Sequence, residues 1–142
     1  MGWLQATLLL LGSILIASCD DILQSDEDRR LGVIAFFGDT AEIELPDTVH
    51  PAISFDAAIR TFAGSCDRMG PTKTSGEADV FVDVKPYDFV YMGPKACDDI
   101  LVAFDHRVNI VIMKPGVVEF RFHGRQLPDG SQMTLIRQVV VR

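Results

Sequence analysis

The chain lacks any run of basic residues. Its 13 lysines and arginines are outnumbered by 20 aspartates and glutamates, which gives a formal net charge of −7. Proteins that bind nucleic acids need clustered cations to neutralise phosphates. The composition therefore argues against a nucleic-acid partner. With 142 residues, the chain is long enough for one domain but not comfortably for two.

The chain also lacks the motifs of several enzyme and metal-binding classes. No Gly-x-Ser-x-Gly nucleophile elbow, glycine-rich phosphate loop, Cys-x-x-Cys pair or His-x-x-x-His pair occurs. No acidic loop offers the about six or more oxygen ligands that calcium takes. We predict that His50, His106 and His123 are solvated, with His106 in a turn between Asp105 and Arg107. We therefore predict no catalytic residues, no metal site, no cofactor and no enzymatic activity.

The first segment of the chain is apolar and uncharged. No charged side chain occurs in residues 1–18, and residues 8–17 form a block of Leu, Ile, Gly, Ser and Ala. A helix needs about 20 apolar residues to span a bilayer, so this block is too short to span one comfortably. Its length is typical of the apolar region of a secretory signal. We therefore predict a signal peptide over residues 1–18, with its apolar part in a helix.

The end of this segment resembles the lipobox of bacterial lipoproteins, in which an aliphatic residue and two small residues precede a cysteine. Here these residues are Ile16, Ala17, Ser18 and Cys19. The resemblance implies that the signal peptidase recognises Ile16 to Ser18 and that Cys19 carries a diacylglycerol as the first mature residue. One feature departs from the family, because no Lys or Arg precedes the apolar block. The alternative is an ordinary signal peptide cut near Ser18, with Cys19 a plain thiol.

The number of cysteines supports lipidation. The chain has three cysteines, and an odd number in an exported protein leaves one thiol to be explained. Lipidation of Cys19 accounts for that thiol and leaves Cys66 and Cys97 as a pair. Export places the pair where disulfides persist. We therefore predict a Cys66–Cys97 bridge, in preference to two reduced thiols, between polar loops expected at residues 64–76 and 91–99.

The mature chain is predicted to be one β domain behind a tether. Residues 19–30 are polar and mostly acidic, which indicates a flexible tether, and residues 31–142 form the domain. Apolar and polar residues alternate there between turns rich in Gly, Pro and Asp, as in β-strands. The strands are expected at residues 33–37, 41–45, 53–59, 80–85, 100–104, 108–112, 118–123 and 134–141, with turns at 115–116 and 127–130. About seven or eight strands at this spacing predict a two-sheet sandwich.

The end of the chain resembles a known sandwich family. Residues 114–124, followed by a hairpin and a valine-rich last strand, are similar to the last two strands of bacterial immunoglobulin-like or fibronectin-III-like domains. The resemblance implies an immunoglobulin-like fold. Two features depart from it: the single tryptophan, Trp3, lies in the signal, and the two domain cysteines are too close for the antibody-type bridge between sheets.

A binding surface is the functional site that the sequence favours. The predicted loop at residues 64–76 is long and polar, and the segment at 86–92 beside it carries several aromatic side chains. Loops on a rigid scaffold often carry recognition, and Tyr and Met are enriched at interfaces. The alternative is that the aromatics only cap the core. The residues predicted to contact a protein partner are Arg68, Met69, Lys73, Tyr87, Phe89 and Tyr91.

Together these features predict an exported envelope protein. We expect a monomer that is anchored to a bacterial membrane by its lipid, on the periplasmic face in a Gram-negative cell, and that acts as a binding or accessory module. The alternative is an inhibitor of an envelope protease that acts through residues 64–76. A small hydrolase is the third and least favoured function.

Overall fold

The computed structural model describes residues 27–77 and 79–142, and this part of the chain is all β. The predicted signal peptide, Cys19 and residues 19–26 of the predicted tether lie outside the described residues. The strands are β1 (Glu27–Leu31), β2 (Val33–Ile34), β3 (Phe36–Phe37), β4 (Thr40–Ala41), β5 (Ile43–Glu44), β6 (Thr48–Val49), β7 (Phe55–Gly64), β8 (Arg68–Glu77), β9 (Phe81–Tyr91), β10 (Leu101–Ile110), β11 (Gly116–Arg125) and β12 (Gln132–Val141). Within these residues, no helix is long and apolar enough to cross a membrane.

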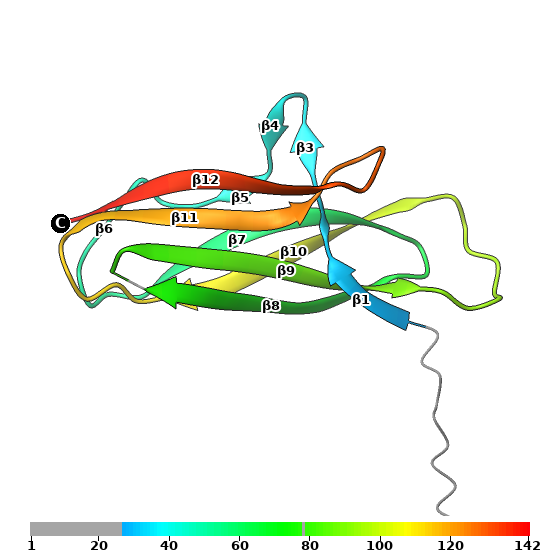
Figure 1. Cartoon of the computed structure of the whole chain (residues 1–142), viewed down its shortest axis with the longest axis horizontal. Helices are drawn as coiled ribbons and strands as arrows, with labels where there is room; N and C mark the ends of the chain where they lie inside the picture. The colour runs from blue at the N-terminus through cyan, green and yellow to red at the C-terminus, as the bar shows by residue number, and fades with distance from the viewer. Residues whose placement is uncertain (1–26, 78) are drawn as a thin grey trace, which may run out of the picture.

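Ten strands form one curled sheet, and β3 and β4 form a separate hairpin that projects from it (Figure 1). The curled sheet folds over into two layers. The front layer, here called the front sheet, contains β1, β8, β9, β11, β12 and β6, and the back layer, here called the back sheet, contains β2, β5, β7 and β10. Figure 1 shows β12, β11, β9 and β8 side by side in front of β7 and β10. The short strand β2 pairs with both β11 and β7, and so joins the two layers. The architecture is a sandwich-like all-β domain, which is compatible with the expected immunoglobulin-like fold.

The core lies between the two layers. On β11, Val118, Phe120 and Phe122 are fully buried, as their alternation with polar residues predicted. Phe120 contacts Phe55 of β7 across the layers, with 6.0 Å between the ring centroids. The β11–β12 hairpin also forms as predicted, through a turn at residues 127–129.

The disulfide joins Cys66 and Cys97, as predicted, with an S–S distance of 2.05 Å. It links the β7–β8 connection to the β9–β10 connection. Polar contacts support the same junction: the Ser65 hydroxyl donates to the Asp98 carbonyl at 2.8 Å. The carboxylate of Asp67 accepts hydrogen bonds from the Gly64 N–H at 2.7 Å and the Tyr91 N–H at 2.8 Å.

Two predicted irregular segments are strands in the structure. Residues 68–76, predicted as part of a long loop, belong to β8, which pairs with β9 from Phe81 to Phe89. The alternation signal is absent there because most of β8 is exposed, as on the edge of a sheet. Residues 27–30, predicted as the end of the tether, belong to β1, which pairs with β9 from Glu27 to Leu31. The described part of the domain thus includes residues 27–30, which the prediction assigned to the tether.

Strand β9 continues through Pro86, where we had expected it to end. Proline donates no ladder hydrogen bond, and it is tolerated in sheets mainly at edges and bulges. On one side of β9, pairing with β11 ends at Val84 and pairing with β1 begins at Tyr87. On the other side, β8 shifts register between Met69 and Thr72, opposite Pro86. Pro86 thus lies where β9 changes partners and requires no donor.

At the end of the domain away from the disulfide, the connection between β10 and β11 depends on Asp79. Its carboxylate accepts hydrogen bonds from the N–H groups of Met113 at 3.0 Å and Lys114 at 3.1 Å. The hydrogen bond from Met113 is the main reason why the pKa of Asp79 is below its usual value. Because the folded-state pKa is lowered, the stabilisation is present above the ordinary aspartate pKa and is lost as the pH falls through the lowered value.

Replacing Asp79 with alanine is therefore expected to lower the urea midpoint at neutral pH. The difference from the wild type should shrink as the solution is acidified below the ordinary range of aspartate titration. Urea unfolding measured at a series of pH values tests this expectation. A difference that persists unchanged into strong acid would contradict it.

Candidate functional site

The outward side of the front sheet gathers cationic and aromatic side chains. Alternate residues of β9 point outward, from Phe81 through Lys85, Tyr87 and Phe89, while Val82 and Val84 point into the core. Register partners on neighbouring strands share a face of the sheet. We call this surface the cationic face, and its defining residues are Arg29, Arg68, Lys73, Phe81, Lys85, Tyr87, Phe89 and Arg121.

The cationic face contains most of the predicted partner-binding residues. Arg68, Lys73, Tyr87 and Phe89 lie on it. Tyr91 lies at the end of β9, and its hydroxyl accepts a hydrogen bond from the backbone N–H of Lys95 at 3.1 Å, so it packs against the disulfide loop. Met69 is opposite Asp88, next to the register shift of β8, and is 50% exposed.

Each arginine of the cationic face lies over an aromatic ring of β9. The guanidinium carbon is 3.9 Å from the ring centroid for Arg68 over Phe89, 4.3 Å for Arg121 over Phe81 and 5.2 Å for Arg29 over Tyr87. Such cation–π contacts contribute about 0.5–1 kcal/mol at exposed sites. They hold the guanidinium groups close to the aromatic rings of β9.

The carboxylates of this face are mostly engaged. Arg68 donates to both carboxylate oxygens of Glu27, and this hydrogen bonding holds the pKa of Glu27 below its usual value. Arg121 donates to Glu119 at 2.6 Å, and Asp83 lies 2.8 Å from a ring nitrogen of His123. Glu77 is also on this side, at the far end of β8.

Lys73 and Lys85 are direct register partners on β8 and β9. Like charges opposite each other destabilise a sheet. Among the residues that the structure describes, neither these two lysines nor Arg29 forms an ion pair. The acid nearest along the strand, Asp83, is hydrogen-bonded to His123. Against these three cations stand two acids of the face without a Lys or Arg partner in the described part of the chain, Asp83 and Glu77, so the face keeps a small net positive charge on a protein whose net charge is −7.

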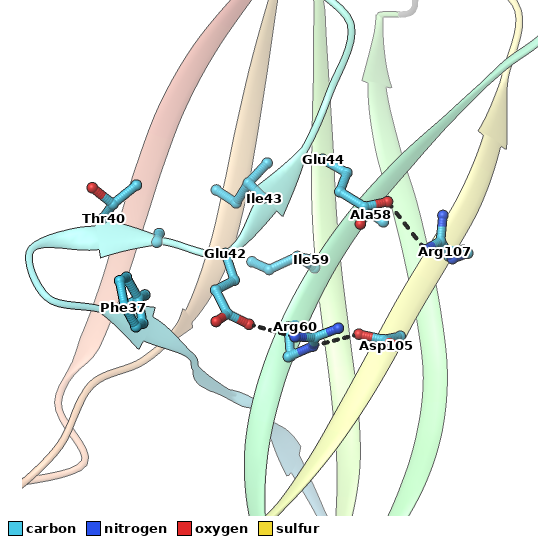
Figure 2. Close-up of a pocket in the computed structure, with 11 residues that line it drawn as sticks. Phe37, Thr40, Glu42, Ile43, Glu44, Ala58, Ile59, Arg60, Asp105 and Arg107 are labelled. Atoms are coloured by element: carbon cyan, nitrogen blue, oxygen red, sulfur yellow. Dashed lines mark hydrogen bonds and ion pairs between the residues drawn. The ribbon is translucent and has the colours of Figure 1, made fainter.

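A groove on the back sheet is a second hollow surface (Figure 2). It measures about 420 Å³, its floor includes Ala58 and Ile59, and Phe37 of the projecting hairpin lies at its rim. Phe37 is 83% exposed. These features would suit an apolar ligand, within the size range of ligand sites.

The charged residues of the groove pair with one another. Arg60 donates to Glu42 at 2.9 Å and to Asp105 at 2.7 Å, and Arg107 lies 3.0 Å from Glu44. The hydrogen bond from Arg60 lowers the pKa of Asp105, and the same bond raises the pKa of Arg60. Figure 2 shows these pairs aligned across β7 and β10. The groove thus presents no unpaired charge that would select a charged ligand.

A buried polar cluster lies behind the cationic face. His106 is 2% exposed in the middle of β10, so the predictions of a turn and of a solvated histidine at this position are wrong. One oxygen of Asp88 lies 2.9 Å from His106 Nε2, and the other accepts the Thr61 hydroxyl at 2.8 Å. On the far side of the ring, Thr72 Oγ1 is 2.9 Å from His106 Nδ1. The side chains come from β7, β8, β9 and β10.

The cluster has the carboxylate–imidazole–hydroxyl order of nucleophilic enzymes, which also need a substrate site beside the hydroxyl. A hollow of about 180 Å³ touches Asp88, but neither His106 nor Thr72 lines it. No buried side-chain nitrogen or oxygen in the described part of the chain lacks a hydrogen-bond partner. The contact between Thr72 and His106 joins β8 to β10, which are not paired through their backbones. The cluster therefore connects the edge strands β8 and β10 through a side-chain hydrogen bond.

Residues 27–77 and 79–142 contain no cluster of three or more His, Cys, Asp or Glu residues placed to hold a metal ion. No family model matches the chain, and no match is found among curated proteins or solved structures.

Proposed function

We propose that the chain is an exported, lipid-anchored binding domain that recognises an acidic partner through the cationic face. The observation that carries this proposal is the in-register pair Lys73–Lys85, neither of which forms an ion pair among the described residues. Keeping two like charges opposite each other costs stability. An anionic group of a partner, placed between them, offsets that cost.

Two further features support an envelope location and a non-catalytic role. The Cys66–Cys97 bridge is of the kind that persists in oxidising compartments, in agreement with the lipobox resemblance at Cys19. The hydroxyl, imidazole and carboxylate of the buried cluster bond to one another. The proposal accordingly assigns no reaction to the chain.

The protease-inhibitor alternative depended on a flexible loop at residues 64–76. Because Arg68–Glu77 form β8, paired along β9, the segment does not project from the scaffold as an inhibitory loop does. The fold thus offers no support for that alternative.

Replacing Lys73 with glutamate tests whether Lys73 and Lys85 repel each other in the folded protein. The change places opposite charges across the β8–β9 pair and is expected to raise the free energy of unfolding by about 0.5 kcal/mol. Urea unfolding measures this gain. A loss of stability would show that the two lysines do not face each other as register partners.

A double variant at the two lysines tests the proposed function. The lipidated wild-type protein should capture its partner from its own membranes, and Lys73→Glu combined with Lys85→Glu should reduce recovery about tenfold. The matched control is Lys95→Glu with Arg142→Glu, which makes the same charge change at exposed positions off the cationic face. Recovery that falls equally in both variants, or in neither, would contradict recognition through this face.

A further inference from the structure

The described chain begins on the cationic face. Its first strand, β1, pairs with β9 so that Glu27 is opposite Tyr91 and Leu31 is opposite Tyr87. Arg29, in the middle of β1, lies over Tyr87. Any segment that precedes Glu27 therefore joins the domain at the edge of this face, next to its aromatic residues.

The distance from the proposed lipid to this face is short. Eight residue steps separate Cys19 from Glu27, the first residue that the structure describes. Eight residues span at most about 28 Å when fully extended. A lipid at Cys19 thus holds Glu27 within about 28 Å of the bilayer.

The charges of the two layers differ in a way that orients the domain. The cationic face carries Arg29, Lys73 and Lys85 without acidic partners among the described residues. On the back sheet, the acids around the groove outnumber the two arginines with which they pair. An anionic membrane surface attracts Lys and Arg within about one Debye length, roughly 10 Å, and repels an acidic surface. Aromatic rings beside cations also suit the headgroup region.

We infer that the acidic partner of the cationic face is the anionic lipid surface of the membrane that holds the anchor. This inference rests on the proposed anchor and on the proposed binding role of the face. The domain lies with β8, β9 and β1 against the phospholipid headgroups. The groove on the back sheet then faces away from the bilayer.

The lysines of the chain provide a built-in test. The sequence contains four, of which Lys73 and Lys85 lie on the cationic face, whereas Lys95 is in the disulfide loop and Lys114 is in the β10–β11 turn. The lipidated protein is reconstituted into vesicles of phosphatidylcholine alone, or of phosphatidylcholine mixed with phosphatidylglycerol. Amine acetylation followed by mass spectrometry then gives the labelling rate of each lysine.

We expect phosphatidylglycerol to slow labelling of Lys73 and Lys85 about fivefold, to leave Lys95 and Lys114 unchanged, and to lose this effect at high salt. In the Arg29→Glu variant the protection of both lysines should weaken, whereas Lys95→Glu should leave it intact. If the labelling rate of each lysine is the same in both kinds of vesicle, the inference is overturned. Equal slowing of all four also overturns it.

A second arm separates this inference from the proposed function. The same labelling is carried out in membranes from the native cell, with their proteins and polysaccharides present. Protection of Lys73 and Lys85 there, but not in phosphatidylglycerol vesicles, means that the face binds another acidic macromolecule. That result overturns the lipid inference and leaves the proposed function standing. Protection in neither system overturns both.

Discussion

Replacing His106 with leucine is expected to lower the free energy of unfolding by about 3–5 kcal/mol. Leucine has a similar volume, so the loss arises from polar groups and not from a cavity. The change removes the donor that lies 2.9 Å from one oxygen of Asp88, a residue only 2% exposed. It also removes the group that the Thr72 hydroxyl contacts at 2.9 Å. A buried carboxyl group and a hydroxyl are left without these partners, and water cannot easily replace them.

A double variant distinguishes this cause from general damage to the core. Replacing both members of a buried hydrogen-bonded pair by apolar residues of similar volume is often nearly neutral, whereas removing one member is costly because the other is left without its partner. The variant Asp88→Leu/His106→Leu should therefore be less destabilised than either single variant, as measured by urea unfolding. The exposed residue His50 provides the control, since His50→Ala should cost about 0.5 kcal/mol or less. A His106→Leu variant as stable as His50→Ala would contradict the role of the cluster.

For the buried polar cluster, the sequence could predict the inward position of His106 but not its contact with Asp88. Val102, Phe104, Val108 and Ile110 alternate with polar residues, and His106 continues the same alternation. Its inward position could therefore have been predicted, but the polar triplet at residues 105–107 was interpreted as a turn. The sequence could not show that Asp88 would meet it, because β9 and β10 are brought together only by the closure of the two layers.

The correct predictions were local. Strand β11 and its hairpin were found because one side of the strand is buried and the other is solvated, which makes the alternation strong. The edge strands β1 and β8 were missed because they are largely exposed and have little alternation. Propensity gives little information at an edge, where pairing with the neighbouring strand decides the conformation.

The cationic face was predicted only in part for a related reason. Tyr87 and Phe89 were recognised as aromatics beside a polar segment, but Lys85 was placed in the strand predicted at residues 80–85, apart from the segment at 86–92. Continuing the alternation through Pro86 would have placed Lys85 with them. The opposition of Lys73 to Lys85 depends on the register shift in β8 between Met69 and Thr72. That shift has no signature in a single sequence beyond Gly70-Pro71.

Replacing Cys66 and Cys97 together with serine is expected to lower the free energy of unfolding by about 3.5 kcal/mol at 25 °C. The two cysteines are 31 residues apart, and the closed segment contains all of β8 and β9. Removing the bridge enlarges the ensemble of the unfolded chain. The native circular dichroism spectrum should be retained, and the urea midpoint should fall. Reduction of the wild-type protein should give the same shift, and a shift below about 1 kcal/mol would contradict a constraint on the unfolded chain.

A variant at Asp67 shows whether the disulfide stabilises the protein by acting on the unfolded or on the folded state. Its carboxylate holds the same junction through the N–H groups of Gly64 and Tyr91, and these bonds exist in the folded state. Asp67→Ala should cost about 1–2 kcal/mol. Because the bridge acts chiefly on the unfolded chain and Asp67 acts on the folded one, the two losses should add in the combined variant. A combined loss well below the sum would instead show that the disulfide positions Asp67 for its hydrogen bonds, so that much of its stabilisation acts in the folded state.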